Sequence, residues 1–221
     1  MVQKVIIVED IDSISQSVNQ VLESFGVSDI TVVKYCDDAW TKIKAAAGRG
    51  VPYDLVITDL SFEKDYRDVA LKGGEALVEA IHLTYPELKT IVYTIEDKPY
   101  RVKKLVETLG VMGYVVKGRR SIEKLKQAIQ AVAAQVPYID PELPHVQQES
   151  GFVSLDSYEI ALLSQLATGL NQEEIGEYFH QQGIKPHSKS AIEKRIARLR
   201  DAFNARNLVH LISIAKDRGI L

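Results

Sequence analysis

Four short apolar runs of this chain each end directly in polar residues, and these endings constrain both the fold and the chemistry. The runs are residues 5–8, 55–58, 91–93 and 114–116, and the residues that follow them are Glu9 with Asp10, Asp59, Thr94 and Lys117. Continuous apolar runs separated by helical stretches are typical of buried parallel strands. The carboxyl ends of such strands face one crevice. We therefore expect three carboxylates, a hydroxyl and an ammonium group to converge on one pocket.

The segments between these runs complete an alternating pattern of strands and helices. Residues 30–35 predict a further strand, and amphipathic periodicity predicts helices over residues 13–25, 38–47, 74–81, 100–109 and 121–132. Strands that alternate with helices of this length indicate the α/β class, with a doubly wound parallel sheet of five strands.

The residue types in the expected pocket suit phosphoryl chemistry. Crowded carboxylates repel one another unless a cation lies between them. Mg²⁺ prefers oxygen ligands, so Glu9, Asp10 and Asp59 form a candidate magnesium site. An aspartate can also accept a phosphoryl group as a nucleophile, which makes Asp59 the candidate acceptor. Lys117 and Thr94 would then stabilise charge on the transferring group.

This ordered set resembles the CheY-like receiver domain of two-component response regulators, over residues 1–135. In that family an acidic pair follows the first strand, the phosphoacceptor Asp follows the third, Thr or Ser the fourth and Lys the fifth. The resemblance implies a flavodoxin-like fold. It implies these roles: Asp59, Thr94 and Lys117 in phosphorylation, Thr94 and Tyr114 in the switch, and Glu9, Asp10, Asp59 and the backbone carbonyl of Ser61 in binding Mg²⁺.

An enzyme with turnover is the first alternative. Phosphatases of the haloacid dehalogenase type also use a strand-end Asp with Mg²⁺, but they carry a second Asp two residues later as general acid. Here that position is Ser61. We therefore expect no enzyme activity beyond Mg²⁺-dependent self-phosphorylation from a phosphodonor.

The segment after Asp59 departs from the usual receiver pattern. Most receivers continue with Met-Pro and a short loop, whereas residues 61–74 lack that proline and are longer and charged. This start and extension resemble the variant found in RcsB-type regulators. Long loops beside a site are sometimes functional and sometimes tolerated insertions, so both interpretations stay open.

Composition favours a cytoplasmic protein of two small domains. The 221 residues have a formal net charge of −3 and a single cysteine, Cys36, which excludes an internal disulfide. No apolar run approaches the roughly 20 residues that span a bilayer, and no signal-peptide pattern is present. Residues 136–153 hold three prolines without sustained periodicity, which predicts a linker.

Residues 154–221 predict a second domain made of four short helices. A capping-box pattern begins at Asp156, and later apolar stripes include Ile192, Ile196 and Leu199. Between residues 185 and 206 there are seven Lys or Arg residues against two acids. A basic helix after a helix and a turn is the arrangement of helix-turn-helix proteins, although charged runs also occur on ordinary solvated faces.

This segment resembles the LuxR-type DNA-binding domain, so the whole chain resembles a NarL/FixJ-type response regulator. Residues 181–188 are longer than the usual turn, and the Thr and His of the recognition helix are replaced by Ala191 and Arg195. The resemblance implies DNA contacts by Lys185, Ser188, Lys189, Ser190, Lys194, Arg195 and Arg198. It also implies a DNA-bound dimer through Leu208, Leu211 and Ile212, residues that could equally pack within their own domain.

The sequence thus predicts a transcription regulator switched by phosphorylation of Asp59. The expected partners are a sensor histidine kinase or phosphotransfer protein, double-stranded DNA and a second copy of the chain, with no membrane. The remaining alternative is a regulator that acts without phosphorylation through protein–protein contacts.

Overall fold

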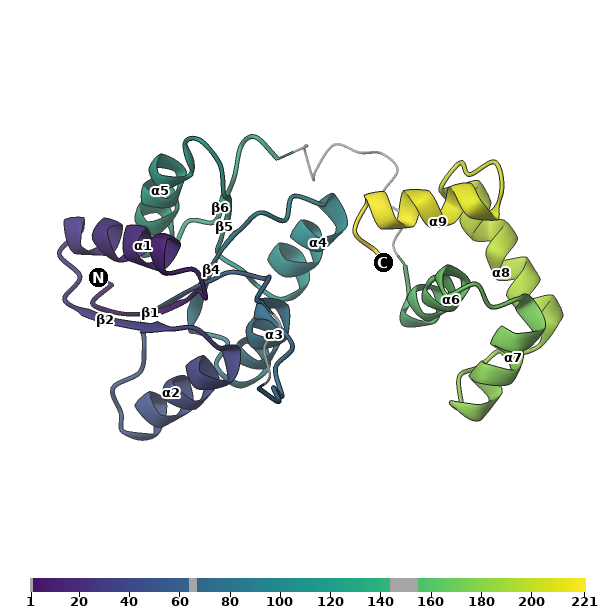
Figure 1. Ribbon diagram of the computed structural model, residues 1–221, viewed down its shortest axis with the longest axis horizontal. Coiled ribbons are helices and arrows are strands. Elements are labelled where there is room, and N and C mark those ends of the chain that lie inside the picture. The colour runs from purple at the N-terminus through teal and green to yellow at the C-terminus, as the bar shows by residue number, and fades with distance from the viewer. Residues whose placement is uncertain (1, 64–66, 144–154) are drawn as a thin grey trace. The chain divides into compact units, whose positions relative to one another are not determined.

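The computed structural model describes residues 2–63, 67–143 and 155–221. The chain divides into two compact units (Figure 1). Of the predicted linker, residues 144–153 lie outside the described residues, as does Ser154.

A six-stranded parallel sheet forms the centre of the first unit, with strand order β2-β1-β3-β4-β5-β6. The strands are β1 (Lys4–Val8), β2 (Asp29–Val33), β3 (Leu55–Thr58), β4 (Lys89–Thr94), β5 (Gly113–Val116) and β6 (Tyr138–Ile139). The helices of this unit are α1 (Asp12–Ser24), α2 (Cys36–Gly48), α3 (Gly74–Thr84) and α5 (Ser121–Ala133), and α4 (Pro99–Lys103) follows β4 in the chain.

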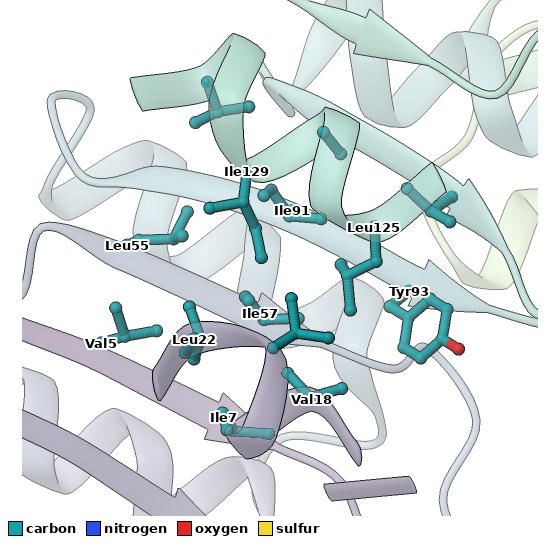
Figure 2. Close-up of a cluster of buried hydrophobic side chains, with 14 of the residues drawn as sticks. Val5, Ile7, Val18, Leu22, Leu55, Ile57, Ile91, Tyr93, Leu125 and Ile129 are labelled. Carbon is teal, nitrogen blue, oxygen red and sulfur yellow. The ribbon is translucent and has the colours of Figure 1, made fainter. Parts of the chain in front are cut away.

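Helices cover both faces of this sheet, because alternate residues of each buried strand point to opposite sides. Val5 and Ile7 of β1 belong to the cluster formed with α1 and α5, whereas Ile6 and Val8 belong to the cluster formed with α2 and α3. Figure 2 shows the first cluster, in which strand residues meet Val18, Leu22, Leu125 and Ile129. Burial on both faces explains why the strands are continuously apolar, and the doubly wound α/β prediction is confirmed.

Two features of the first unit differ from the sequence prediction. The fourth helix does not continue regularly to residue 109; α4 passes into a π-helical turn over Lys104–Thr108. The sheet also has one strand more than predicted, because Tyr138 and Ile139 pair with β5. These residues lie in the range assigned to the linker, where two residues are too few to give a periodic signal.

The second unit consists of helices, as predicted. They are α6 (Ser157–Ala167), α7 (Gln172–Gln181), α8 (Lys189–Ala202) and α9 (Leu208–Asp217). Asp156 and Glu159 form the predicted capping box of α6, and Ile192, Ile196 and Leu199 of α8 are buried in the core of this unit. Among the helices of the described residues, none is long and apolar enough to cross a membrane.

Candidate functional site

The predicted pocket residues follow neighbouring strands of the first unit. β1, β3, β4 and β5 are consecutive in the sheet. The last residues of β1 and β3 pair, Val8 with Thr58, and so do those of β4 and β5, Thr94 with Val116. Between these pairs, Thr58 lies opposite Val92, two residues before the end of β4. Glu9, Asp59 and Lys117 therefore leave one edge of the sheet together.

Lys117 joins two of the carboxylates. Its Nζ lies 2.8 Å from Oε2 of Glu9 and 2.5 Å from Oδ2 of Asp59. The side chains of Glu9 and Asp59 are only 3% and 6% exposed, so this pairing forms away from bulk water. The Lys117 backbone N–H donates to the carbonyl of Thr94 at 2.7 Å, which fixes the lysine to β4. The ammonium group thus compensates the charges of two buried carboxylates.

Backbone amides hold the other oxygen of Asp59. Oδ1 accepts hydrogen bonds from the N–H of Leu60 at 2.6 Å and of Ser61 at 3.2 Å. Gly74 packs so tightly beneath this turn that a Cβ there would lie 1.8 Å from the Asp59 carbonyl oxygen. These two hydrogen bonds fix the orientation of the carboxylate, so Asp59 is presented as an oriented nucleophile with Oδ2 toward Lys117.

Burial and charge act on the pocket in opposite directions. Burial raises the pKa of Glu9 above its usual value, although the hydrogen bond and charge of Lys117 oppose that rise. For Lys117, burial alone would lower the pKa, but the hydrogen bonds and charges of Asp59 and Glu9 outweigh it and the pKa is raised. Lys117 therefore stays an ammonium at neutral pH.

The donor types of the pocket suit a magnesium ion, but the pocket holds Lys117 between two of its carboxylates. Oxygen ligands from Glu9, Asp10 and Asp59 are those Mg²⁺ prefers. Within the described part of the chain, no three His, Cys, Asp or Glu residues are grouped for binding a metal. The structure gives the reason: Lys117 contacts Glu9 and Asp59, while Oδ2 of Asp10 accepts from the backbone N–H of Glu63 at 2.8 Å.

Thr94 and Tyr114, the predicted switch pair, both contact the backbone of Glu96. The Thr94 hydroxyl accepts from the N–H of Glu96 at 3.4 Å, and the Tyr114 hydroxyl donates to the Glu96 carbonyl at 2.9 Å. Both side chains are fully buried. The loop after β4 therefore connects the two residues in this conformation.

The long loop after β3 is anchored to the start of α2 by two acidic residues that sequence reasoning missed. Asp38 accepts two hydrogen bonds from the Arg67 guanidinium, at 2.6 and 3.1 Å. Asp37 accepts from the backbone N–H groups of Ala70 and Leu71, each at 2.9 Å. Acidic residues at the start of a helix are usually explained by the helix dipole alone. The one sequence signal for a further role of this pair is the unusual length of the loop that it binds.

In the second unit, the residues predicted to contact DNA fall into two groups. Lys185, Ser188, Lys189, Ser190, Lys194 and Arg198 are exposed at the turn before α8 and along that helix. Arg195 differs, because its guanidinium lies 3.0 Å from both Asp156 and Glu159 of the α6 capping box. Glu159 is only 1% exposed. Arg195 is therefore held toward α6 by this ion pair, and its contact with DNA stays a prediction.

The predicted dimer contacts on α9 differ in how far they are buried within their own unit. Leu211 is fully buried in the core of its own unit, so it has no surface to offer to a partner. Leu208 and Ile212 are partly buried against the same core. Val209, which the sequence analysis did not select, is 80% exposed. A helix packed on a small core can leave one of its apolar side chains exposed to solvent. The sequence around Val209 does not indicate which apolar residue of α9 that is.

Comparison with known proteins identifies a family and several similar folds. Residues 5–130 match the family of the response regulator receiver domain. The RcsB response regulator of Salmonella typhimurium has a TM-score of 0.65 and 19% identity, over 97% of this chain and 99% of that one. A complex of the response regulator RcsB with DNA gives 0.64 and 19%, over 98% and 99%.

A two-component response regulator of the LuxR family from Aurantimonas sp. SI85-9A1 is similar over a shorter region. Its TM-score is 0.54 at 19% identity, over 65% of this chain and 93% of that one. No match is found among curated proteins. At such identities the structural matches establish the fold, whereas the family rests on the receiver match.

Proposed function

Since the chain belongs to the response regulator receiver family, we propose that it is the response regulator of a two-component system and controls transcription. Phosphorylation of Asp59 would shift dimerisation and sequence-specific binding to DNA. The observation that carries this proposal is the buried carboxylate of Asp59, which Lys117 and two backbone amides hold at the same edge as Glu9. We assign the receiver to the first unit, which extends past the predicted boundary at residue 135 to include β6, and the LuxR-type domain to residues 154–221.

The phosphoryl group would come from a histidine kinase, a phosphotransfer protein or a small acyl phosphate. An oxygen of Asp59 attacks phosphorus, and the bond from phosphorus to the donor breaks with its electron pair leaving on the donor. Oδ1 is engaged by two amides, so Oδ2 is the attacking atom in this geometry. Lys117 then moves its hydrogen bond from Oδ2 to the new phosphoryl oxygens, and Thr94 donates its hydroxyl proton to one of them.

Mg²⁺ is the cofactor we assign to this pocket, with Glu9, Asp10, Asp59 and the backbone carbonyl of Ser61 as ligands. When bound, the ion supplies positive charge to the phosphoryl oxygens. Since Lys117 bridges Glu9 and Asp59, metal binding requires the ammonium to withdraw from Glu9. The proposal includes no turnover, because Ser61 stands where a phosphatase of the dehalogenase type has its acid.

Coupling to the output is proposed through Thr94 and Tyr114. If the Thr94 hydroxyl turns to a phosphoryl oxygen, its contact with the Glu96 amide is lost. The Tyr114 hydroxyl holds the carbonyl of that same residue, so the loop and the tyrosine respond together. Phosphorylation thereby biases an existing equilibrium between two conformations of this face.

The second unit is proposed to bind double-stranded DNA as a dimer, with α8 in the major groove. The exposed cations at and before α8, Lys185, Lys189, Lys194 and Arg198, support this assignment, as does the DNA complex of RcsB, which has a similar fold. Affinity from such cations is directed to phosphates and falls steeply with salt. We also propose that the protein acts in the cytoplasm, where it would meet both DNA and a phosphodonor, without membrane contact.

The proposal is tested by incubating the purified chain with Mg²⁺ and a small acyl phosphate and measuring the mass of the intact protein. We expect one added phosphoryl group, lost in Asp59→Ala and retained in the control Asp29→Ala, whose aspartate lies at the opposite end of the sheet. An unmodified wild-type protein that still binds DNA would refute the proposal and favour a regulator that acts through protein–protein contacts.

A further inference from the structure

The outer edge of β5, the strand that leads to Lys117, is covered by β6 and the residue that follows it, Asp140. β6 contains only Tyr138 and Ile139, paired with Gly113 and Tyr114. Asp140 is 2% exposed, although it belongs to a segment whose sequence suggested only a linker. A buried carboxylate requires hydrogen-bond donors or a cation as partners, and the partners of Asp140 indicate what it does.

Beyond the end of β6, the backbone and side chain of Asp140 continue the hydrogen bonding to β5. Its backbone N–H donates to the Tyr114 carbonyl at 2.8 Å, as a ladder residue would. The next donor along β5 is the N–H of Val116, and it meets no backbone carbonyl of β6; it donates to Oδ2 of Asp140 at 3.1 Å. The carboxylate thus replaces the missing ladder acceptor at the last residue before Lys117.

Lys124 of α5 neutralises this carboxylate. Its Nζ lies 2.9 Å from Oδ1 and 3.1 Å from Oδ2 of Asp140. The N–H of Glu142 also donates to Oδ1, at 3.0 Å. With these donors both carboxylate oxygens are satisfied, which makes the buried charge tolerable and fixes its position.

The backbone at Lys117 is consequently fixed from both sides of β5. Toward β4, the Lys117 N–H binds the Thr94 carbonyl at 2.7 Å; toward β6, the preceding N–H binds Asp140. A lysine side chain has a long flexible stem, so the placement of Nζ between Glu9 and Asp59 depends on where its backbone is held.

We propose that Asp140 is a positioning residue for Lys117, and that it tunes the phosphorylation of Asp59 through the Val116 amide. The inference rests on the proposed function. It assigns to the first residues after β6 a part in the reaction. The rate of phosphorylation depends on the position of Oδ2 as a hydrogen-bond acceptor, whereas the charge of Asp140 mainly stabilises the fold.

Four variants of the full-length chain separate these two contributions. Asp140→Ala removes both the acceptor and the charge. Asp140→Glu keeps the charge but displaces the acceptor by one methylene. Asp140→Asn keeps an acceptor for the Val116 amide without the charge, and Lys124→Met removes the ion pair while leaving the acceptor in place. For each, the rate of Asp59 phosphorylation by a small acyl phosphate with Mg²⁺ is compared with the urea midpoint.

We expect Asp140→Ala and Asp140→Glu to phosphorylate about tenfold more slowly, as a misplaced catalytic group would. Asp140→Asn and Lys124→Met should stay near the wild-type rate, although their midpoints fall. Rates that follow the midpoints across all four variants would overturn the inference, as would a wild-type rate in Asp140→Glu. If Asp140→Ala does not fold, the Glu and Asn pair decides. Absence of phosphorylation in the wild-type protein would instead refute the proposed function, and the inference with it.

Discussion

Lys117→Ala should destabilise the first unit in a way that depends strongly on pH. The substitution leaves Glu9 and Asp59, 3% and 6% exposed, without the ammonium that lies between them. Removing one partner of a buried charge pair costs about 3–5 kcal/mol. The folded variant can reduce this penalty by protonating one carboxylate, and Glu9 is the first candidate because burial raises its pKa.

The free energy of that protonation limits the electrostatic penalty. The usual pKa of Glu is 4.5, and each unit between pH and pKa corresponds to about 1.4 kcal/mol. The limit is therefore about 3.4 kcal/mol at pH 7 and about 0.7 kcal/mol at pH 5. We expect the variant to be less stable than wild type by about 3 kcal/mol at pH 7 and by less than about 1 kcal/mol at pH 5.

Urea unfolding monitored by fluorescence measures this difference in the full-length protein. Trp40 of α2 is the only tryptophan of the chain, so its emission reports on the first unit alone. Lys34→Ala is the matched control, because Lys34 forms an ion pair with Asp12 but is 51% exposed. Such surface pairs contribute little to stability. A loss in Lys117→Ala that is equally large at both pH values, or no larger than the control, would contradict this reasoning.

Three further outcomes follow from the structure. Gly74→Ala should destabilise the first unit by more than about 2 kcal/mol in urea unfolding, because its Cβ would lie 1.8 Å from a backbone carbonyl oxygen. The control Gly48→Ala has open space around the Cβ and should be neutral or stabilising. Equal unfolding midpoints for the two variants would contradict this. Burial raises the pKa of the Cys36 thiol to about 12, so the stability due to the neutral thiol is present below pH 9 and is lost as pH rises toward 12. Wild type should therefore lose more stability over that range than Cys36→Ala. Parallel profiles of stability against pH for the two proteins would contradict this prediction. Arg195→Ala leaves the buried Glu159 without its closest cation, so it should lower the thermal midpoint of the helical unit, measured by circular dichroism on the full chain. An unchanged midpoint would contradict a stabilising role of this ion pair.

The receiver pocket could be predicted from sequence because parallel strands place it at one sheet edge. Each of Glu9, Asp59, Thr94 and Lys117 follows an apolar run, and strand direction alone brings such endings together. The same logic gave the doubly wound fold, since strands buried on both faces are apolar throughout. What it could not give is the arrangement within the pocket, where Lys117 contacts two carboxylates at once.

The features that escaped prediction depend on tertiary contacts between short or exposed segments. β6 is too short for a periodic pattern, and Asp140 is recognisable only once β5 is seen to lack an acceptor beside Val116. Arg195 lies in the sequence where a recognition helix contacts the DNA groove, but in the structure it forms an ion pair with the buried Glu159 of α6. Leu211 and Val209 are both apolar residues of α9, and only the helix rotation decides which is buried.

The most direct test of the central claim is sizing and DNA binding of the full-length protein with Mg²⁺, with and without beryllofluoride, an analogue of the phosphoryl group. Binding is measured against a randomised duplex pool at fixed salt, because affinity depends on ionic strength. We predict that beryllofluoride with Mg²⁺ shifts the protein to a dimer and tightens DNA binding, and that neither change occurs in Asp59→Ala. An unchanged oligomeric state and affinity in the wild-type protein would contradict the account.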